Sequence, residues 1–470
     1  MNSEVKVFAR EDGQIQRVHV VSFDDWSKLD FLQPRGDKRA LQCFYDIYKN
    51  FLVPTAPWIF PQMVMFQLPE KIEFSPEPKS GACEDMLLVA SKVLQNGVKL
   101  RGGKPVFSTK EAKVLWEELE AKDCVRIVCG KFPKTKIIPV GYFVGYMSEC
   151  EQDAQMKVNA NFFIMDPIDC ATIYDQVGRP FGLCVKKGVV TNPPLFEREA
   201  LLVKEDGSVL VKPVDLRSLT IEINGVLYKH GENATVYVRP ERAKTPRIGG
   251  NCIVIVGNRV VDIKENGPVD IPASGFVIRV DKESFVAPRT LADGTKMKEC
   301  PLCESVAKYA DVNIGDEVVY HGLEDVQFGI QVGNSIIRDG VKTSEFISRF
   351  YNLYHLERVP FPPSLYPMDF EGARAARMAI GADKDGKPVV FWAEGKGKIS
   401  YTPGRDSTGA SLSEMADIAE ELGLYNAINL DGGGSAQILL KNMRSLHISD
   451  RKTEDNSDAE RLVPMGLIVR

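Results

Sequence analysis

The chain has 470 residues, of which 44% are apolar and 26% are charged, so it is long enough to bury at least one large core. Its net charge of -5 and its pI near 5.8 exclude an electrostatic basis for binding nucleic acid or an anionic membrane, and neither is predicted as a partner. Any phosphate in a ligand would therefore be held by a few local groups.

The first 120 residues contain two helix-like stretches and no recognisable catalytic motif, and we predict a small α/β extension with an accessory role. One helix is predicted over residues 38–50. The second follows Ser108 and Thr109, which are suited to capping a helix. The positions that share helical spacing in the second stretch are Glu111, Val114, Leu115 and Leu119.

The N-terminus lacks the basic start and apolar run of a secretory signal, which predicts a cytoplasmic protein or one released from a cell or carried by a virion. Three prolines interrupt the most apolar stretch, residues 51–68, so we predict a packed extended segment and no membrane span. The ten cysteines are predicted to be free thiols. Cys300 and Cys303 have the spacing of half a zinc site, but the matching half is missing, which favours ordinary buried or loop cysteines, and neither a metal nor another cofactor is predicted.

From residue 121 to residue 470 the sequence predicts an α+β domain with a mixed, largely antiparallel sheet and a few packed helices. Short alternating strands are separated by pairs of residues that accept positive φ and so favour tight hairpins. These pairs are Asp206-Gly207, Asn224-Gly225, Asp339-Gly340 and Asp385-Gly386, with a further turn at Gly257-Asn258.

One helix in this domain has clear signals at both ends. Ser411 is a good N-cap, Glu414 completes a capping box, and Gly423 is suited to ending the helix. Its apolar stripe consists of Leu412, Met415, Ala416, Ala419 and Leu422. A strand over residues 425–430 is predicted to follow at once.

This strand leads into Asn429-Leu430-Asp431, three consecutive glycines and Ser435. Period-two geometry places Asn429 and Asp431 on one face and Ile428 and Leu430 on the other, toward a core. Three glycines are costly in conformational entropy, which indicates a need for backbone room or positive φ, and their N–H groups can form an anion-binding nest. A plain hairpin turn needs fewer glycines and neither the carboxylate nor the hydroxyl, so the pattern favours a functional site.

Two weaker motifs lie upstream. Alternation places Asn159 and Asn161 on one face, where their amides can hydrogen-bond sugar hydroxyls or can tie down a neighbouring loop. Arg377 opens a short strand over residues 377–381 and can grip phosphate oxygens, although an isolated arginine there is more often a surface residue.

In this order the motifs resemble the phosphodiester glycosidase family over residues 147–470. The segments that carry the resemblance are Asn159 with Phe162-Phe163, Gly178 to Gly182, Gly329 to Gly340, Arg377 to Gly381, Asn429 to Ser435 and the closing segment Arg461 to Val469. Ala160-Asn161 replaces the usual glycine pair, and the segment from residue 342 to residue 367 is idiosyncratic. These departures indicate a pocket that admits a different sugar or aglycone.

The resemblance implies a hydrolase that cleaves the glycosidic bond of a sugar-1-phosphodiester, similar to an α-N-acetylglucosamine-1-phosphodiester, and releases sugar and a phosphomonoester. The catalytic residues it implies are Asp431, Arg377 and Asn159. The substrate-binding residues it implies are Gly432, Gly433, Gly434, Ser435, Asn429, Asn161 and Gly182. A glycan or sugar phosphodiester is thus the expected partner, and no oligomeric state is predicted.

In this hypothesis Arg377 and the glycine amides hold the phosphate, and Asp431 acts as base or nucleophile. The alternative role for Asp431 is that of a structural acceptor that fixes the glycine turn. His230 is an alternative acid, although a lone histidine near a hairpin is more often structural. The unranked candidates for a second carboxylate are Asp166, Asp169, Asp175 and Glu197.

Two other classes of function remain open. A non-catalytic carbohydrate-binding or virion-associated module could share this fold, but the presence of both Asp431 and Arg377 favours an enzyme. A nucleotide- or phosphate-binding regulator could use the glycine turn as a nest. The absence of a Walker lysine after the glycines disfavours it.

Overall fold

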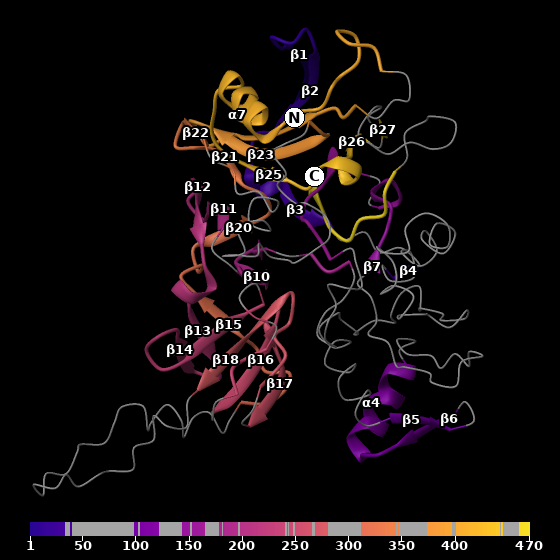
Figure 1. The fold of residues 1–470 in the computed structure, drawn as a ribbon, viewed down its shortest axis with the longest axis vertical. Coiled ribbons are helices and arrows are strands. Elements are labelled where there is room, and N and C mark those ends of the chain that lie inside the picture. The colour runs from indigo at the N-terminus through magenta and orange to yellow at the C-terminus, as the bar shows by residue number, and fades with distance from the viewer. Residues whose placement is uncertain are drawn as a thin grey trace, which may run out of the picture.

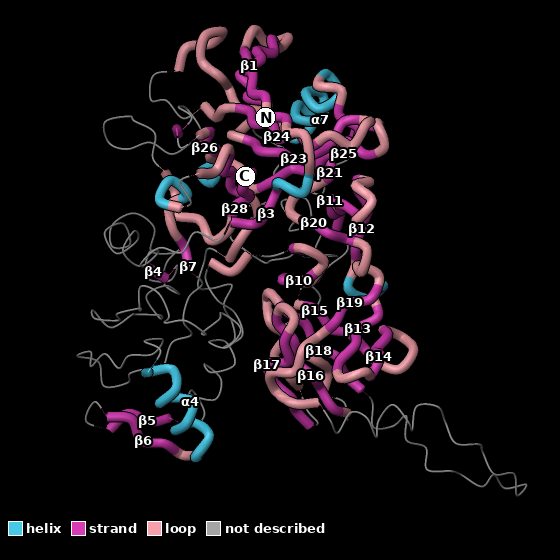
Figure 2. The backbone as a smooth tube through the Cα atoms, turned by 180° about the vertical axis from the view of Figure 1, so that it is seen from behind, coloured by secondary structure: helices cyan, strands magenta, loops and turns pink. Residues whose placement is uncertain are grey.

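The structure is a computed structural model that is dominated by strands (Figures 1 and 2). It describes residues 1–32, 38–39, 98–101, 104–121, 143–150, 153–164, 178–180, 182–195, 198–239, 242, 244–247, 250–265, 268–280, 312–344, 346, 374–396, 401–441, 443–444 and 460–470. All the strand pairs within the sheets of these segments are antiparallel, which confirms the predicted largely antiparallel sheet.

The largest sheet has seven strands and carries the motifs of the C-terminal half. In spatial order its strands are β1 (Asn2–Ala9), β2 (Ile15–Ser22), β24 (Pro388–Ala393), β23 (Arg377–Asp383), β25 (Leu424–Leu430), β21 (Ser335–Arg338) and β22 (Val341–Lys342). Helix α7 (Leu412–Glu421) covers one face, where Met415 packs in a cluster with Ala379 and Ala427. Ile428 and Leu430 enter the larger core on the other face, as predicted. Both faces of β25 are therefore buried.

The first 32 residues are part of the same sheets as the C-terminal half. Strand β2 pairs with β24, from Val18↔Ala393 to Ser22↔Val389. Strand β3 (Leu29–Leu32) pairs with β28 (Gly466–Val469). The boundary predicted near residue 120 therefore does not separate residues 1–32 from the rest, because these strands bury their apolar side chains in the shared core.

Two five-stranded sheets complete the part of the molecule around the candidate site. One has the order β27 (Met443–Arg444), β26 (Ile438–Leu440), β8 (Met156–Asn159), β28 and β3. The other has the order β10 (Val189–Asn192), β9 (Cys184–Lys186), β20 (Val326–Ile330), β11 (Arg198–Lys204) and β12 (Val209–Val214). Their inward side chains join the core beneath β25.

The remaining strands form smaller sheets, and the two larger of these lie below the seven-stranded sheet in Figure 1. One contains β14 (Val226–Lys229), β13 (Thr220–Ile223) and β19 (Val319–His321), and the other β15 (Thr235–Val238), β18 (Gly275–Val280), β16 (Asn251–Val256) and β17 (Arg259–Glu265). The strand pairs are β4 (Lys38–Arg39) with β7 (Phe143–Val144) and β5 (Val98–Arg101) with β6 (Lys104–Phe107).

The predicted hairpin turns are all confirmed. Asn224 and Asp339 each have a φ of 51°, a left-handed conformation that asparagine and aspartate tolerate better than most side chains. Gly207, Gly386 and Gly257 occupy the same region in the other turns. Local residue chemistry was therefore sufficient to place each of these hairpins.

The two α-helices of the described residues agree with prediction in position but only partly in packing. In α7, the Ser411 hydroxyl accepts from the Glu414 N–H and the Glu414 carboxylate accepts from the Ser411 N–H, which confirms the capping box. In α4 (Lys110–Ala121), Ala112 and Trp116 are buried, whereas Val114 is 54% exposed. Glu111 and Val114, two of the positions predicted to share helical spacing, therefore lie on the exposed side of α4.

Three sequence predictions fall largely outside the described residues. Of the helix predicted over residues 38–50, the structure describes only Lys38 and Arg39, which form a strand. The apolar segment over residues 51–68 lies outside the described residues, as do Cys300 and Cys303. Within the described segments, no helix is long and apolar enough to span a membrane.

Candidate active site

The glycine turn lies at the end of the seven-stranded sheet where Arg377 begins β23. Strands β23 and β25 are paired with Met378 opposite Leu430, so the next residues outward are Arg377 and Asp431. The Gly433 N–H donates to the Ala376 carbonyl over 2.7 Å. A Cβ on Gly432 would lie 2.6 Å from that carbonyl oxygen. The turn therefore packs directly against the backbone that leads into Arg377.

Glycine is required at positions 432 and 433 for different structural reasons. Gly433 has a φ of 55°, in the left-handed region, whereas Gly432 has a φ of -124° that any residue can adopt. Gly432 is required because its neighbour leaves no room for a side chain. Gly433 to Ser435 form a short 3-10 helix in which the Ser435 N–H donates to the Gly432 carbonyl over 3.0 Å. Gly434, within it, remains partly accessible to solvent.

The environment of the Asp431 carboxyl raises its pKa toward neutral pH. Burial raises the pKa of Asp431 to about 6, against the opposing effects of the Arg461 guanidinium, the Ser435 hydroxyl and the Gly432 N–H. The residue nevertheless keeps some accessible surface. Arg461 Nη1 donates to Ser435 Oγ over 2.8 Å, and the guanidinium lies 5.4 Å from the centroid of the Phe163 ring. A reachable carboxyl with this pKa can accept or donate a proton near neutrality.

Asn159 ties the neighbouring sheet to the glycine turn. Its Nδ2 donates to the Asp431 carbonyl over 2.6 Å, and its Oδ1 accepts from the Gln437 N–H over 2.9 Å. The Asp431 N–H donates in turn to the Ala160 carbonyl over 2.9 Å. Asn159 is 1% exposed. Its side chain therefore holds the backbone on both sides of the turn in place.

Asn429 differs from Asn159 in that neither polar atom of its amide finds a hydrogen-bond partner among the described residues. It is 1% exposed, and a Cβ on Gly333 would lie 2.7 Å from Asn429 Nδ2. The Gly333 backbone thus packs against the amide. Burying an unsatisfied polar group costs about 1–3 kcal/mol, so this asparagine is a candidate ligand-binding group.

The other predicted site residues have defined partners in the structure. Arg377 is 8% exposed, and its Nε donates to the Ala410 carbonyl over 3.2 Å. Asn161 Nδ2 contacts Cys184 Sγ at 3.3 Å, so Asn159 and Asn161 engage different partners. Gly182 has a φ of 88°, and a Cβ there would lie only 1.9 Å from the Gln331 carbonyl oxygen. Close backbone packing thus accounts for Gly182.

The structure brings Asp431, Arg377 and Asn159 to one end of the sheet and adds Arg461, which sequence reasoning had not placed in the site. The available signal was that Arg461 opens the closing family-like segment, as Arg377 opens its own strand. His230 Nδ1 accepts from the Val236 N–H over 3.0 Å within its own hairpin. The four candidate second carboxylates, Asp166, Asp169, Asp175 and Glu197, lie outside the described residues.

Within the described segments, no three His, Cys, Asp or Glu side chains cluster closely enough to hold a metal ion. The polar groups that act on Asp431 are instead the Arg461 guanidinium, the Ser435 hydroxyl and the Gly432 N–H. Such groups suit an anionic, hydroxyl-rich ligand.

Residues 250–470 match the phosphodiester glycosidase family. The resemblance inferred from the motifs is thereby confirmed. An 87-residue segment is 36% identical to the N-acetylglucosamine-1-phosphodiester alpha-N-acetylglucosaminidase of Mus musculus and 38% identical to that of Homo sapiens. The matched segment covers 18% of this chain and 15% of each relative.

Two solved structures align over the whole chain at low similarity. A hypothetical protein from Synechocystis has 14% identity and a TM-score of 0.43, with 62% of that protein covered. The catalytic domain of zebrafish N-acetylglucosamine-1-phosphodiester alpha-N-acetylglucosaminidase, auto-inhibited by its pro-peptide, has 12% identity and a TM-score of 0.38, with 82% covered. At these TM-scores the likeness carries no argument about function.

Proposed function

We propose that the chain hydrolyses the glycosidic bond of a sugar-1-phosphodiester and releases the sugar and a phosphomonoester. The observation that carries the proposal is the partly accessible Asp431 carboxyl, whose pKa is raised to about 6 beside Arg461 and Ser435. The match of residues 250–470 to the phosphodiester glycosidase family supports it. The relatives act, by their names, on N-acetylglucosamine-1-phosphodiesters, which is the substrate class proposed for this chain.

In the proposed mechanism the ionised Asp431 is the base or the nucleophile. As a base, it would take a proton from a water molecule that attacks the anomeric carbon. The bond between that carbon and the phosphate oxygen breaks, and its electron pair leaves with the phosphomonoester. Because this leaving group is already weakly basic, it needs less help from a general acid than an alkoxide would.

The proposed role of the arginines is to offset phosphate charge. Arg461 already acts electrostatically on Asp431, and Arg377 begins its strand opposite the start of the glycine turn. An arginine fork fits phosphate oxygens, and its charge is worth more in a site that excludes water. Of the three glycine amides, that of Gly433 is bonded to Ala376, which restricts the proposed anion nest.

The proposed sugar-binding group is Asn429. Its amide is buried and its two polar atoms lack partners among the described residues, so a ligand hydroxyl or N-acetyl group would satisfy them. Asn159 is proposed to act differently, as a positioning residue that holds the Asp431 carbonyl. Its amide is already occupied on both sides of the turn.

A pair of substrates tests the proposal with the purified chain. Methyl N-acetyl-α-glucosaminyl phosphate carries the phosphodiester, whereas methyl N-acetyl-α-glucosaminide has the same sugar with a neutral aglycone. Release of free N-acetylglucosamine from the first, at a rate at least about a hundredfold above the second, is the expected result. Binding of the phosphodiester without release of sugar would instead identify a carbohydrate-binding module.

A further inference from the structure

Strand β1 forms one edge of the seven-stranded sheet and stands apart at the end of the molecule (Figures 1 and 2). It pairs with β2 along its whole length, from Asn2↔Ser22 to Ala9↔Ile15. No other strand of the described residues pairs with its outer edge. Such an edge presents unpaired N–H and C=O groups that can pair with another strand.

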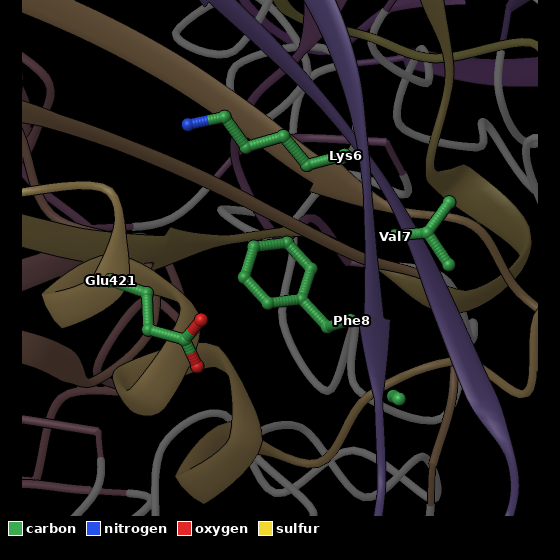
Figure 3. Close-up of a pocket in the computed structure, with 5 residues that line it drawn as sticks. Lys6, Val7, Phe8 and Glu421 are labelled. Atoms are coloured by element: carbon green, nitrogen blue, oxygen red, sulfur yellow. The ribbon is translucent and has the colours of Figure 1, made fainter.

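The two faces of β1 differ in chemistry. Val5 and Val7 share one face and are 53% and 58% exposed. Glu4 and Lys6 share the other, where Lys6 Nζ lies 3.3 Å from Glu4 Oε1. Figure 3 shows Lys6 extending toward the side where helix α7 lies and Val7 pointing the opposite way. One face thus offers apolar surface and the other offers a pair of opposite charges.

The charged face of β1 is not filled by the neighbouring helix. A hollow of about 450 Å³ lies between β1 and the end of α7, and its lining residues are Lys6, Val7, Phe8, Ala9 and Glu421 (Figure 3). None of these residues belongs to the glycine turn or contacts Asp431 in the described structure. The Lys6 and Glu4 side chains, which are 42% and 51% exposed, are therefore accessible to the side chains of an added strand.

We propose that β1 pairs antiparallel with β1 of a second copy of this chain, about a two-fold axis that passes through Val5 perpendicular to the sheet. In this register Glu4 of each copy lies opposite Lys6 of the other, and the two Val5 side chains meet at the axis. Opposite charges and paired β-branched residues stabilise antiparallel neighbours. The two seven-stranded sheets then form one continuous sheet.

The sequence of β1 permits this register and disfavours its neighbours. Moving the axis to Lys6 would place Lys6 opposite Lys6, and moving it to Glu4 would place Glu4 opposite Glu4. An axis midway between residues is not available, because it would place side chains of different faces opposite each other. Like charges directly opposite each other are destabilising, so the register centred on Val5 is favoured over those centred on Glu4 and Lys6.

The dimer is expected to be reversible and weak. Pairing of two eight-residue strands buries less surface than a standard interface, and exposed ion pairs add little. A dissociation constant on the order of 10–100 µM is expected from an interface of this size. The dimer does not require the proposed function, because the glycine turn lies on other strands.

Charge reversal tests the dimer on the full-length chain by sedimentation velocity between about 5 and 500 µM, a range set by the expected affinity. Glu4→Lys alone and Lys6→Glu alone each place like charges opposite one another and should weaken dimerisation at least about tenfold. The double variant Glu4→Lys/Lys6→Glu restores both opposite pairs and should return within about threefold of the native chain. Thermal unfolding controls for the loss of the Lys6–Glu4 pair within each copy.

A cysteine pair checks the register. Val5→Cys should form a disulfide between copies under mild oxidation, because the two side chains meet at the axis. Val7→Cys should not, because Val7 would lie opposite Ser3. Peptide mapping separates these bonds from those of the native cysteines. A chain that stays monomeric throughout, a dimer indifferent to the single reversals, or equal cross-linking at both positions would each overturn the proposal.

Discussion

Two turns of this molecule share the residues aspartate, glycine and serine but place the aspartate in opposite environments. Asp206-Gly207-Ser208 joins β11 to β12 in solvent, where the Ser208 hydroxyl and N–H lower the pKa of Asp206. Asp431 precedes three glycines and Ser435 at the end of β25, where burial raises its pKa to about 6. Residue type alone therefore does not distinguish a turn former from a candidate catalytic group, and water access does.

The glycines of the two turns are required for different reasons. Gly207 has a φ of 82° with open space around its Cβ position, so its role is conformational. Gly432 has an ordinary φ but no space, because the Ala376 carbonyl lies against it. One glycine allows the chain to reverse direction, and the other allows two segments to approach each other.

The largest expected effect is on turnover. Asp431→Asn should lower turnover of the sugar phosphodiester by about 10²- to 10⁴-fold, the range typical of removing a group that transfers a proton. Asp206→Asn, the matched change in the exposed turn, should leave turnover unchanged. A folded Asp431→Asn variant with the native rate would remove the basis for the proposed mechanism.

The second prediction concerns the free energy of unfolding. Gly432→Ala should lower it by about 1–3 kcal/mol, because the new methyl group has to displace the backbone before Arg377. Gly207→Ala should cost about 1 kcal/mol, the price of positive φ without a clash. Urea denaturation measures the free energy of unfolding of both variants. A larger loss for Gly207→Ala than for Gly432→Ala would contradict the prediction.

The third prediction is a pH-dependent stability difference of opposite sign in the two turns. The pKa of Asp431 is raised on folding, so between pH 3.8 and about 6 the unfolded chain has lost a proton that the folded chain keeps. Stability conferred by the protonated group is therefore lost as pH rises through this window. Asp431→Asn should then be more stable than the native chain above pH 6, by about 1–3 kcal/mol, and not at pH 3.5.

The exposed turn supplies the control for that measurement. The pKa of Asp206 is lowered on folding, so its contribution is present above the unfolded pKa and is lost as pH falls. Asp206→Asn should slightly destabilise the chain at pH 7. Thermal unfolding of both variants across pH 3.5 to 8 would contradict the comparison if their stability changes had the same sign at neutral pH.

The smallest expected effect is on the pH profile of catalysis. The Arg461 guanidinium lowers the pKa of Asp431, so Arg461→Gln should raise that pKa and move the acid limb of kcat/KM to higher pH. Relative to the plateau value of the same variant, kcat/KM at pH 6 is expected to be about two- to tenfold lower, in addition to the loss of rate from the missing phosphate contact. Ser435→Ala should move the limb in the same direction by less. A limb that moves to lower pH would show that Arg461 does not act through Asp431.

The sequence was sufficient to predict those parts of the structure that depend on residues close together in the chain. The hairpin at Asp206-Gly207 and the helix between Ser411 and Gly423 follow from turn chemistry and capping, and both are confirmed. The order of the family-like motifs also predicted Asp431, Arg377 and Asn159 as site residues, and the fold brings their backbones together at one end of the sheet.

What the sequence could not show depends on contacts between distant segments. The approach of Arg461 to Asp431 requires the closing segment to lie beside the glycine turn, and no local pattern encodes that distance. The Gly182 requirement arises from the Gln331 carbonyl almost 150 residues later. The buried face of α4 follows Trp116 rather than Val114, because the ring finds a partner in Phe107.

The pairing of β3 with β28 has a consequence for how the chain is made. Residues 29–32 acquire their sheet partner only when residues 466–469 have left the ribosome, and β2 waits in the same way for β24. Strand β3 remains unpaired through most of synthesis and β2 has only β1 as a neighbour, and closing such long loops makes folding slow. A fragment starting at residue 250 would carry the family match, but β24 would lose its neighbour β2 and β28 would lose both of its neighbours, β8 and β3, which predicts aggregation of the excised domain.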